Sequence, residues 1–193
     1  VENFRDGSLI MIITGRRGGG KTALGMKLVE LGKVFKKKIY VIGFESSKVP
    51  RFVKKAEDLD SVANGSLVLI DEAGISFSAR SSMKKVNKRM GELLSIARHK
   101  NLSLIFITQN SAMLDLNVLR LADVLLFKEP SLLQNRFERK SLQDLFDKVG
   151  ANFKDVKDKK NHFYAISDDF EGLVWNDLPG FWNESISKSF SKK

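Results

Sequence analysis

Cysteine is absent from the 193 residues of this sequence, and long hydrophobic runs are absent as well. Without cysteine, the chain has neither disulfides nor thiolate metal sites, which suits an intracellular protein. No apolar run approaches the roughly 20 residues that a membrane-spanning helix needs. The N-terminus also lacks the charged, then apolar, then small-residue pattern of a signal peptide. We therefore expect a cytoplasmic protein with no membrane segment in this chain.

Acidic residues are outnumbered by basic ones, at 23 Asp and Glu against 33 Lys and Arg, which gives a formal net charge of +10. Such a balance indicates polyanionic partners, although nucleotide binding and solubility also tolerate it. The hydrophobic content of 42% and the charged content of 29% are typical of a soluble globular chain. The length predicts one domain with a substantial core, with room for a small appendage.

A glycine-rich segment lies between an apolar run and a helix-like stretch. It reads G-x-x-x-x-G-K-T from Gly15 to Thr22, and this context of strand before and helix after gives the pattern its meaning. The glycines let backbone N–H groups approach phosphate oxygens, and the helix N-terminus adds positive potential. We expect Lys21 to supply a charge to the β- and γ-phosphates and the Thr22 hydroxyl to be a Mg²⁺ ligand. The expected nucleotide contacts are Gly15, Arg16, Arg17, Gly18, Gly19, Gly20, Lys21, Thr22 and Ala23.

Helical patterns alternate with apolar runs along most of the chain, which predicts an α/β fold with a mainly parallel sheet covered on both faces. Pro50 is expected to open a helix through residues 53–56, and a capping box at Ser141 to start another that ends before Gly150. The predicted strands are residues 9–13, 39–42, 67–70, 102–107 and 124–127. Two more β runs predict a hairpin at about residues 161–176. We expect one domain over residues 1–178 and a basic tail over 179–193, in which Trp182, Ile186 and Phe190 could line a docking helix.

A carboxylate pair follows the third predicted strand. Asp71 ends this strand, so its carboxylate is expected beside the glycine-rich loop, where it can hold the Mg²⁺ shell. The adjacent Glu72 can orient and activate water for attack on a γ-phosphate. The pair therefore favours hydrolysis over phosphoryl transfer to a small acceptor. An apolar run followed by Asp-Glu is common by itself. The catalytic interpretation of Asp71-Glu72 depends on the presence of the glycine-rich loop in the same chain.

Two polar residues follow the fourth predicted strand. In a parallel sheet the carboxyl ends of the strands border the ligand crevice. Gln109 is thus a candidate to contact the γ-phosphate or the attacking water and to report nucleotide state. The alternative is that Thr108 and Gln109 only cap a loop. Arg98 lies on the preceding helix, where it can also be a surface cation that interacts with the helix dipole.

Three segments together resemble the HerA/FtsK superfamily of RecA-like motor ATPases. They are the loop from Gly15 to Thr22, residues 70–73 around Asp71-Glu72, and residues 97–109, which run from Ala97-Arg98 to Thr108-Gln109. Within this superfamily the chain is most similar to the small viral and plasmid branch, which includes packaging ATPases and the Zot-like assembly proteins of filamentous phage. The resemblance covers roughly residues 8–130. It implies a RecA-like P-loop NTPase fold with the C-terminal hairpin as an addition.

The resemblance also implies roles for individual residues. Lys21 would contact phosphates, Thr22 and Asp71 would hold Mg²⁺, Glu72 would be the catalytic base and Gln109 the polar sensor. Such motors form rings in which the nucleotide lies between neighbours and an arginine of the next subunit completes the site. Arg98 is the first candidate for this arginine, followed by Arg80 and Arg89. Zot-like assembly proteins carry a membrane-spanning segment, which this sequence lacks.

Positive charge is concentrated between the Asp-Glu pair and the following helix. The candidates for contact with DNA phosphates are Arg80, Lys84, Lys85, Lys88 and Arg89. Such cations bind the backbone without reading sequence, and the alternative is a solvated helix face.

The sequence thus predicts a Mg²⁺-dependent ATPase that binds ATP, acts on DNA and assembles as a homo-oligomeric ring. If the protein is viral, we expect it in the host cytoplasm. The alternatives are a nucleotide-switched, Zot-like assembly protein and a small-molecule P-loop kinase.

Overall fold

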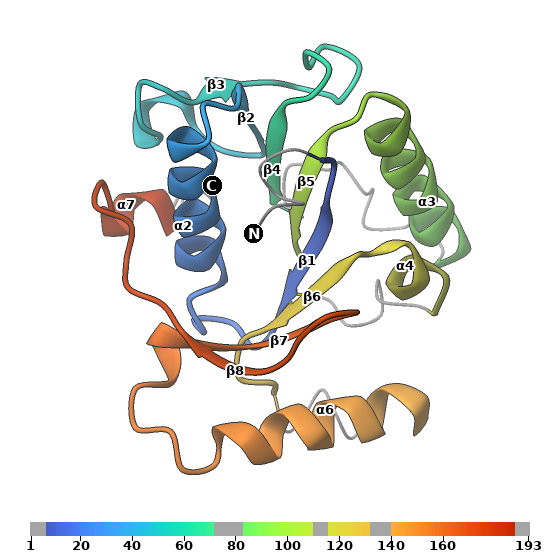
Figure 1. Cartoon of the computed structure of the whole chain (residues 1–193), viewed down its shortest axis with the longest axis vertical. Coiled ribbons are helices and arrows are strands. Elements are labelled where there is room, and N and C mark those ends of the chain that lie inside the picture. Colours follow the sequence, from blue (N-terminus) through green and yellow to red (C-terminus); the bar gives the residue numbers. More distant parts are fainter. Residues whose placement is uncertain (1–6, 72–82, 110–115, 132–139, 188–193) are drawn as a thin grey trace.

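Each apolar run that the sequence predicts as a strand forms one in the computed structural model, which describes residues 7–71, 83–109, 116–131 and 140–187. The strands are β1 (Ile10–Thr14), β2 (Ile39–Ile42), β3 (Lys54–Lys55), β4 (Leu67–Asp71), β5 (Ser103–Ile107), β6 (Val124–Phe127), β7 (His162–Ser167) and β8 (Glu171–Trp175). They form one sheet in the order β3-β2-β4-β5-β1-β6-β7-β8 (Figure 1). The pairs from β3 to β6 are parallel, and the hairpin adds β7 and β8 antiparallel at one edge. The mainly parallel α/β fold is confirmed.

Helices cover both faces of this sheet. The helical elements are α2 (Lys21–Val34), η1 (Ser46–Lys48), α3 (Met83–His99), α4 (Leu116–Leu121), α6 (Lys140–Phe153), η4 (Lys159–Asn161) and α7 (Glu184–Ser187). In Figure 1, α2 and α7 lie on one side of the sheet and α3 and α4 on the other, with α6 beneath β7 and β8. The strands need long apolar runs because neither face of the sheet is left to water.

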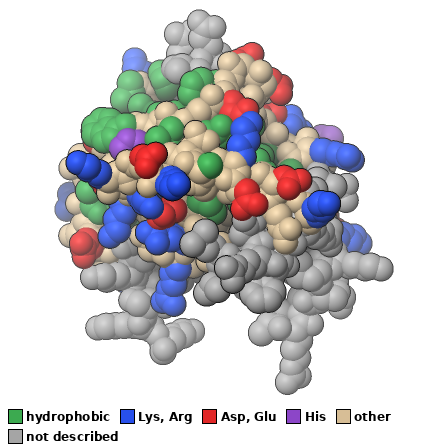
Figure 2. Space-filling view, turned by 90° about the horizontal axis from the view of Figure 1, so that it is seen from below, with side chains coloured by type: hydrophobic (Ala, Val, Ile, Leu, Met, Phe, Trp, Pro, Cys, Tyr) green, Lys and Arg blue, Asp and Glu red, His purple; other side chains and the backbone are tan. Residues whose placement is uncertain are grey.

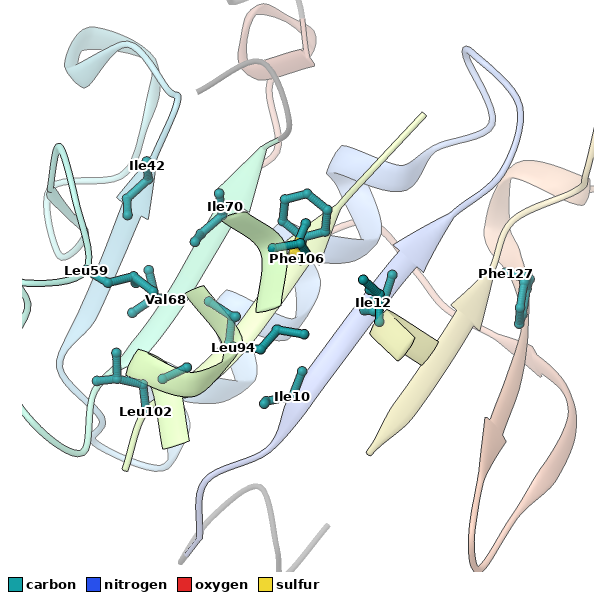
Figure 3. Packing of buried hydrophobic residues seen from close by; sticks show 14 of the residues in the cluster. Ile10, Ile12, Ile42, Leu59, Val68, Ile70, Leu94, Leu102, Phe106 and Phe127 are labelled. Carbon is teal, nitrogen blue, oxygen red and sulfur yellow. The ribbon is translucent and has the colours of Figure 1, made fainter. Parts of the chain in front are cut away.

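The core consists of two hydrophobic clusters separated by the sheet. Along β1, Ile10 and Ile12 belong to the cluster under α3, α4 and α6, whereas Met11 and Ile13 belong to the cluster under α2 and α7. This alternation follows from the period of two along a strand. Figure 3 shows how β1, β4 and β5 contribute side chains to the first cluster, with Phe106 at its middle. Burial on both faces fixes the strand register, and with it the edge at which the loops meet.

Two glycines bring α2 close to the sheet. A Cβ on Gly25 would lie 2.9 Å from the Cδ1 atoms of both Leu69 and Ile107, and a Cβ on Gly32 would overlap the side chain of Leu67. Because interiors are close-packed, a side chain at either position would require the neighbouring leucine and isoleucine side chains, or the helix, to shift. The first turn of α2 is therefore held close to the carboxyl ends of β4 and β5.

Several local predictions differ from the structure. The prediction of a helix after Pro50 is wrong. The chain makes one turn there and then forms β3, which pairs with β2. Hydrogen bonding to the free edge of β2 therefore outweighs the helical spacing of the local sequence. Gly150 lies inside α6 and does not end it, because the helix continues to bury Phe153. Ser141 likewise lies inside the helix. In the predicted docking segment a short helix, α7, buries Ile186; Trp182 precedes this helix, and Phe190 lies outside the described residues. Within the described part, no helix has both the length and the apolarity to cross a bilayer.

Candidate functional site

The segment between β1 and α2, residues 15–22, is called here the phosphate loop. Gly15, Gly18 and Gly20 have φ angles of 139°, 74° and 89°, which side-chain-bearing residues rarely adopt. Gly20 is the N-cap of α2 in a left-handed conformation, without a side-chain cap. The first N–H groups of a helix have no intrahelical acceptors and carry positive potential, so this terminus can bind an anion. The glycine spacing in the sequence thus corresponds to the backbone conformation that a phosphate site requires.

Lys21 curls back into the phosphate loop. Its Nζ donates to the carbonyl oxygens of Gly15 and Arg16, both at 2.8 Å, and the residue is only 5% exposed. A buried ammonium needs polar partners, and here backbone carbonyls provide them. The loop therefore already contains a positive charge at its centre. Phosphate oxygens are stronger, charged acceptors for the same group.

The parallel register brings the other predicted polar groups to the edge where the phosphate loop lies. Asp71 is aligned with Ile107, and Ile107 in turn with Ile13. Thr108 follows on β5, is fully buried, and donates its N–H to the carbonyl of Ile13 at 3.0 Å. Asp71 is 9% exposed, whereas Gln109 is exposed. Because β5 pairs directly with β1, the β5 terminus borders the loop and the β4 carboxylate lies one strand further away.

The remaining loop residues are placed as follows. Arg16, Arg17 and Gly18 are exposed, Gly19 and Ala23 are buried, and Thr22 is partly exposed in the first turn of α2. Glu72, the predicted base, lies outside the described residues, as does Arg80. The catalytic assignment of Glu72 therefore stays a prediction from the sequence.

Arg98 lies near the amino ends of the parallel strands, whereas the phosphate loop lies at their carboxyl ends. Its Nη2 donates to Asp123 Oδ1 at 3.1 Å and to the carbonyl of Leu121 at 3.0 Å. The other carboxylate oxygen of Asp123 accepts the N–H of Ile10 at 2.7 Å. These contacts are at the amino ends of β1 and β6, so the structure does not bring Arg98 to the loop of its own chain. A role on a neighbour's nucleotide remains the prediction from the resemblance.

The basic residues proposed for DNA contact are only partly described. The side chain of Lys88 on α3 is 80% exposed and lies 4.0 Å from Glu92, while the side chains of Lys84, Lys85 and Arg89 lie outside the described set. On the face seen in Figure 2, Lys and Arg side chains lie among Asp and Glu. That face thus mixes both signs of charge.

One buried residue next to the phosphate loop was not predicted from the sequence. Lys128 directly follows β6 and is fully buried. Its Nζ donates to the carbonyls of Lys160 at 2.8 Å and His162 at 2.9 Å, and to Oδ1 of Asn176 at 3.2 Å. Burial lowers the pKa of Lys128 to about 8, partly offset by the charge of Asp158. The signal was a charged residue at the carboxyl end of an apolar strand, the same signal used for Asp71.

Metal ligation was tested on the residue types at this edge. Among residues 7–71, 83–109, 116–131 and 140–187, no group of three or more His, Asp or Glu side chains is placed to hold a metal ion. Mg²⁺ bound with a nucleotide needs only one or two protein oxygens, since phosphates and water supply the rest. The hydroxyl of Thr22 and the carboxylate of Asp71 are oxygen donors of the type that Mg²⁺ prefers, so the residues fit this ion.

Comparison with known proteins identifies the family. The family model described as zonular occludens toxin (Zot) matches residues 22–168, more than half of the chain, so the chain belongs to this family. No curated protein matches the sequence.

Solved structures identify the fold. The genome packaging NTPase B204 from Sulfolobus turreted icosahedral virus 2, in complex with ATP-gammaS, is 19% identical with a TM-score of 0.62, covering 89% of this chain and 97% of that one. Its complex with AMP gives 17% identity and a TM-score of 0.59, covering 89% and 98%. The chain therefore has the fold of a RecA-like P-loop NTPase. The resemblance to packaging and Zot-like ATPases that the motifs predict is confirmed.

Proposed function

We propose that this member of the Zot family is an ATP-hydrolysing motor that packages or translocates DNA. The observation that carries the proposal is the phosphate loop, with three glycines at positive φ and Lys21 drawn into its centre. Support comes from the polar strand ends beside it and from the fold that the chain shares with a viral genome packaging NTPase. The family supports a motor or assembly ATPase over the small-molecule kinase that a P-loop alone would allow.

In the proposed reaction, water attacks the γ-phosphorus of ATP and the bond to the β–γ bridging oxygen breaks, releasing ADP and phosphate. Lys21 stabilises negative charge on the β- and γ-phosphates. Glu72 accepts the proton of the attacking water, and Gln109 orients that water. Thr22 and Asp71 would hold Mg²⁺, which when bound neutralises charge on the phosphates. The role of Glu72 is proposed from the sequence, and the other roles are proposed from residue type and from position at the carboxyl ends of the parallel strands.

Oligomerisation and DNA binding are further parts of the proposal. Arg16 and Arg17 at the tip of the loop are exposed, so a neighbouring subunit can contact the loop there. Arg98 is the candidate arginine from that neighbour on the basis of the resemblance. Within its own chain it makes an exposed pair with Asp123 and contacts the Leu121 carbonyl, and it would have to leave these partners to reach a neighbour's nucleotide. The basic start of α3 would bind DNA phosphates, with an affinity that falls steeply as salt increases.

The test is ATP hydrolysis by the full chain, with and without DNA, together with its mass in solution in the same conditions. We expect Mg²⁺-dependent hydrolysis that DNA stimulates, and a ring in the presence of ATP. Lys21→Ala is the matched control, because it removes the loop's charge and should abolish both nucleotide binding and hydrolysis. A wild-type chain that hydrolyses no ATP, or that stays monomeric and indifferent to DNA in all conditions, would refute the motor.

A second candidate is a nucleotide-switched assembly ATPase that acts through protein partners and does not pump DNA. The family match favours this candidate specifically. It predicts slow hydrolysis that DNA does not change, together with partner binding that requires ATP. Hydrolysis rates with and without DNA therefore separate the two candidates.

A further inference from the structure

We propose that Lys128 is a positioning residue of the phosphate loop, and that through it the C-terminal hairpin is part of the nucleotide site. The inference rests on the proposed ATP-binding function of this loop. The term clamp is used here for Lys128, Glu129, the segment 158–162 and Asn176. Apart from Lys128 and Glu129, these residues belong to the hairpin and its approach, more than 130 positions after the loop in sequence.

The Lys128 ammonium has a complete set of acceptors. A protonated lysine has three N–H donors and no acceptor, and three oxygens lie within reach. They belong to the carbonyls of Lys160 and His162 and to the amide of Asn176, at 2.8, 2.9 and 3.2 Å. This match favours the charged form in a site without solvent exposure. The same three bonds join β6 to the start of β7 and to the residue after β8.

The stem of Lys128 lies directly under the phosphate loop. A Cβ built on Gly15 would lie 2.7 Å from Lys128 Cβ, and one built on Gly19 would lie 3.4 Å from the same atom. The Lys128 N–H also donates to the carbonyl of Thr14 at 2.8 Å, where β1 ends. The carbonyl oxygen of Lys160 lies 3.1 Å from a Cβ position on Gly20. The loop therefore takes its shape against the clamp.

Glu129 forms a second connection between the loop and the hairpin segment. Its carbonyl accepts the N–H of Arg16 at 3.0 Å. Its carboxylate pairs with Arg16 and with Lys159, both at 2.6 Å. The side chain of Glu129 is 17% exposed, so these pairs are partly shielded from water. Two adjacent residues thus connect the same loop to the same segment.

The position of the charge points to a phosphate. Lys128 Nζ lies 3.8 Å from the Cβ position of Gly20, the N-cap of α2. A helix N-terminus is itself positive, so a cation beside it is unfavourable unless an anion is bound there. The ammonium of Lys21 adds a third positive group to the same loop. A triphosphate bound at this loop would attract all three positive groups and so offset their mutual repulsion.

The experiment compares the full-length wild type with Lys128→Met, which keeps an unbranched stem and removes the charge and donors. The measurements are the dissociation constant of ATP, kcat and KM, and the thermal midpoint without nucleotide. We expect ATP to bind at least about tenfold more weakly to Lys128→Met, because displaced binding groups lose effects of this size or larger. KM should rise more than kcat falls, since the loop is displaced and the strand ends of β4 and β5 are unchanged.

The control is Leu59→Ala, which removes buried side-chain carbons from the segment after β3, on the side of the sheet away from the hairpin. It should lower the thermal midpoint while leaving the ATP dissociation constant within about twofold, as expected for independent sites. If Lys128→Met behaves like Leu59→Ala, the residue is only structural and the inference is wrong.

Asn176→Ala provides a second variant in case Lys128→Met does not fold. It removes one acceptor and should weaken ATP binding severalfold, and unchanged binding would overturn the inference. A wild type that binds no ATP would instead overturn the proposed function itself.

Discussion

The two flanks of β1 differ in what they bring to the phosphate loop. On one flank, Thr108 follows β5 and Asp71 ends β4, and in the proposed function these polar groups lie toward the reacting end of the nucleotide. On the other flank, Lys128 and Glu129 follow β6 and bind the loop to the hairpin. We call these the catalytic flank and the clamp flank. The difference suggests that the first sets the chemistry and the second sets the shape of the loop.

The flanks also differ in the kind of contact that holds their polar groups beside the loop. Thr108 and Asp71 reach the loop through the register of parallel strands alone. The Lys128 ammonium depends on residues 32, 34 and 48 positions away along the chain. In the proposed function, damage to the catalytic flank should reduce the rate more than the affinity. Damage to the clamp flank, against which the loop takes its shape, should reduce affinity first.

The largest expected effect is on the catalytic flank. Glu72→Gln removes the proposed base and keeps the size of the side chain, so kcat should fall by about 10²–10⁴-fold. ATP binding should stay near the wild-type value, because the loop and the clamp are unchanged. Single-turnover hydrolysis and an ATP titration on the same preparation measure both quantities. Normal hydrolysis by Glu72→Gln would show that the base is another group.

Much of the catalytic flank was predictable from sequence because its signals are local. The glycine spacing, Asp71 after an apolar run and Thr108-Gln109 after another each lie within a few residues of one strand end. The strands were predictable for the same reason, since continuous apolar runs indicate burial on both faces. The order of residues alone is therefore enough to place Asp71 and Thr108 at one edge of a parallel sheet.

The clamp flank could not be predicted in this way. The three acceptors of Lys128 come from η4, the start of β7 and the residue after β8. The pairings of β6 with β7 and of β7 with β8 bring them together. A lysine after a strand is otherwise typical of a surface loop. For the same reason β3 was not predicted: this two-residue strand forms by pairing with the edge of β2. Pairing between distant segments leaves little trace in local sequence.

The second prediction uses the titration of Lys128 to separate the flanks. Burial lowers its pKa to about 8 from the ordinary 10.5. Between these values the unfolded chain holds a proton that the folded chain has released, so this residue makes the unfolding free energy rise with pH. The rise amounts to up to about 3 kcal/mol. ATP affinity should fall over the same range, because the cation near the loop is lost.

The measurement is the difference between wild type and Lys128→Met from pH 7 to 10, in denaturant unfolding and in ATP binding. The subtraction is needed because other groups surround this lysine. The charged and titratable residues of the segments packed around it are Arg16, Lys21, Glu129, Asp158, Lys159, Lys160, His162 and Asp177. Opposite slopes for stability and affinity are expected. Slopes of the same sign would contradict a role of this cation in binding phosphate.

The third prediction compares two glycines within the loop. Gly15 touches the clamp flank, because its Cβ position lies 2.7 Å from Lys128 Cβ, whereas a Cβ on Gly18 meets nothing within 4 Å. Gly18→Ala should cost only the left-handed backbone strain of about 1–2 kcal/mol. Gly15→Ala should cost about 1–3 kcal/mol more, from the steric overlap. Urea unfolding measures both, and equal costs would show that the contact between loop and clamp is loose.

The smallest effect is expected for the ion pair at the loop's surface. Arg16→Ala removes the 2.6 Å pair with Glu129, but Arg16 is 51% exposed, and exposed pairs contribute less than about 1 kcal/mol. The backbone N–H of residue 16 still donates to the Glu129 carbonyl, and Lys159 still pairs with the carboxylate. Unfolding in urea at low and high salt should therefore show a small, salt-sensitive loss, with the exposed neighbour Arg17→Ala as control. A loss well above 1 kcal/mol would mean that the arginine side chain, rather than Lys128, is the main attachment of the loop to the clamp.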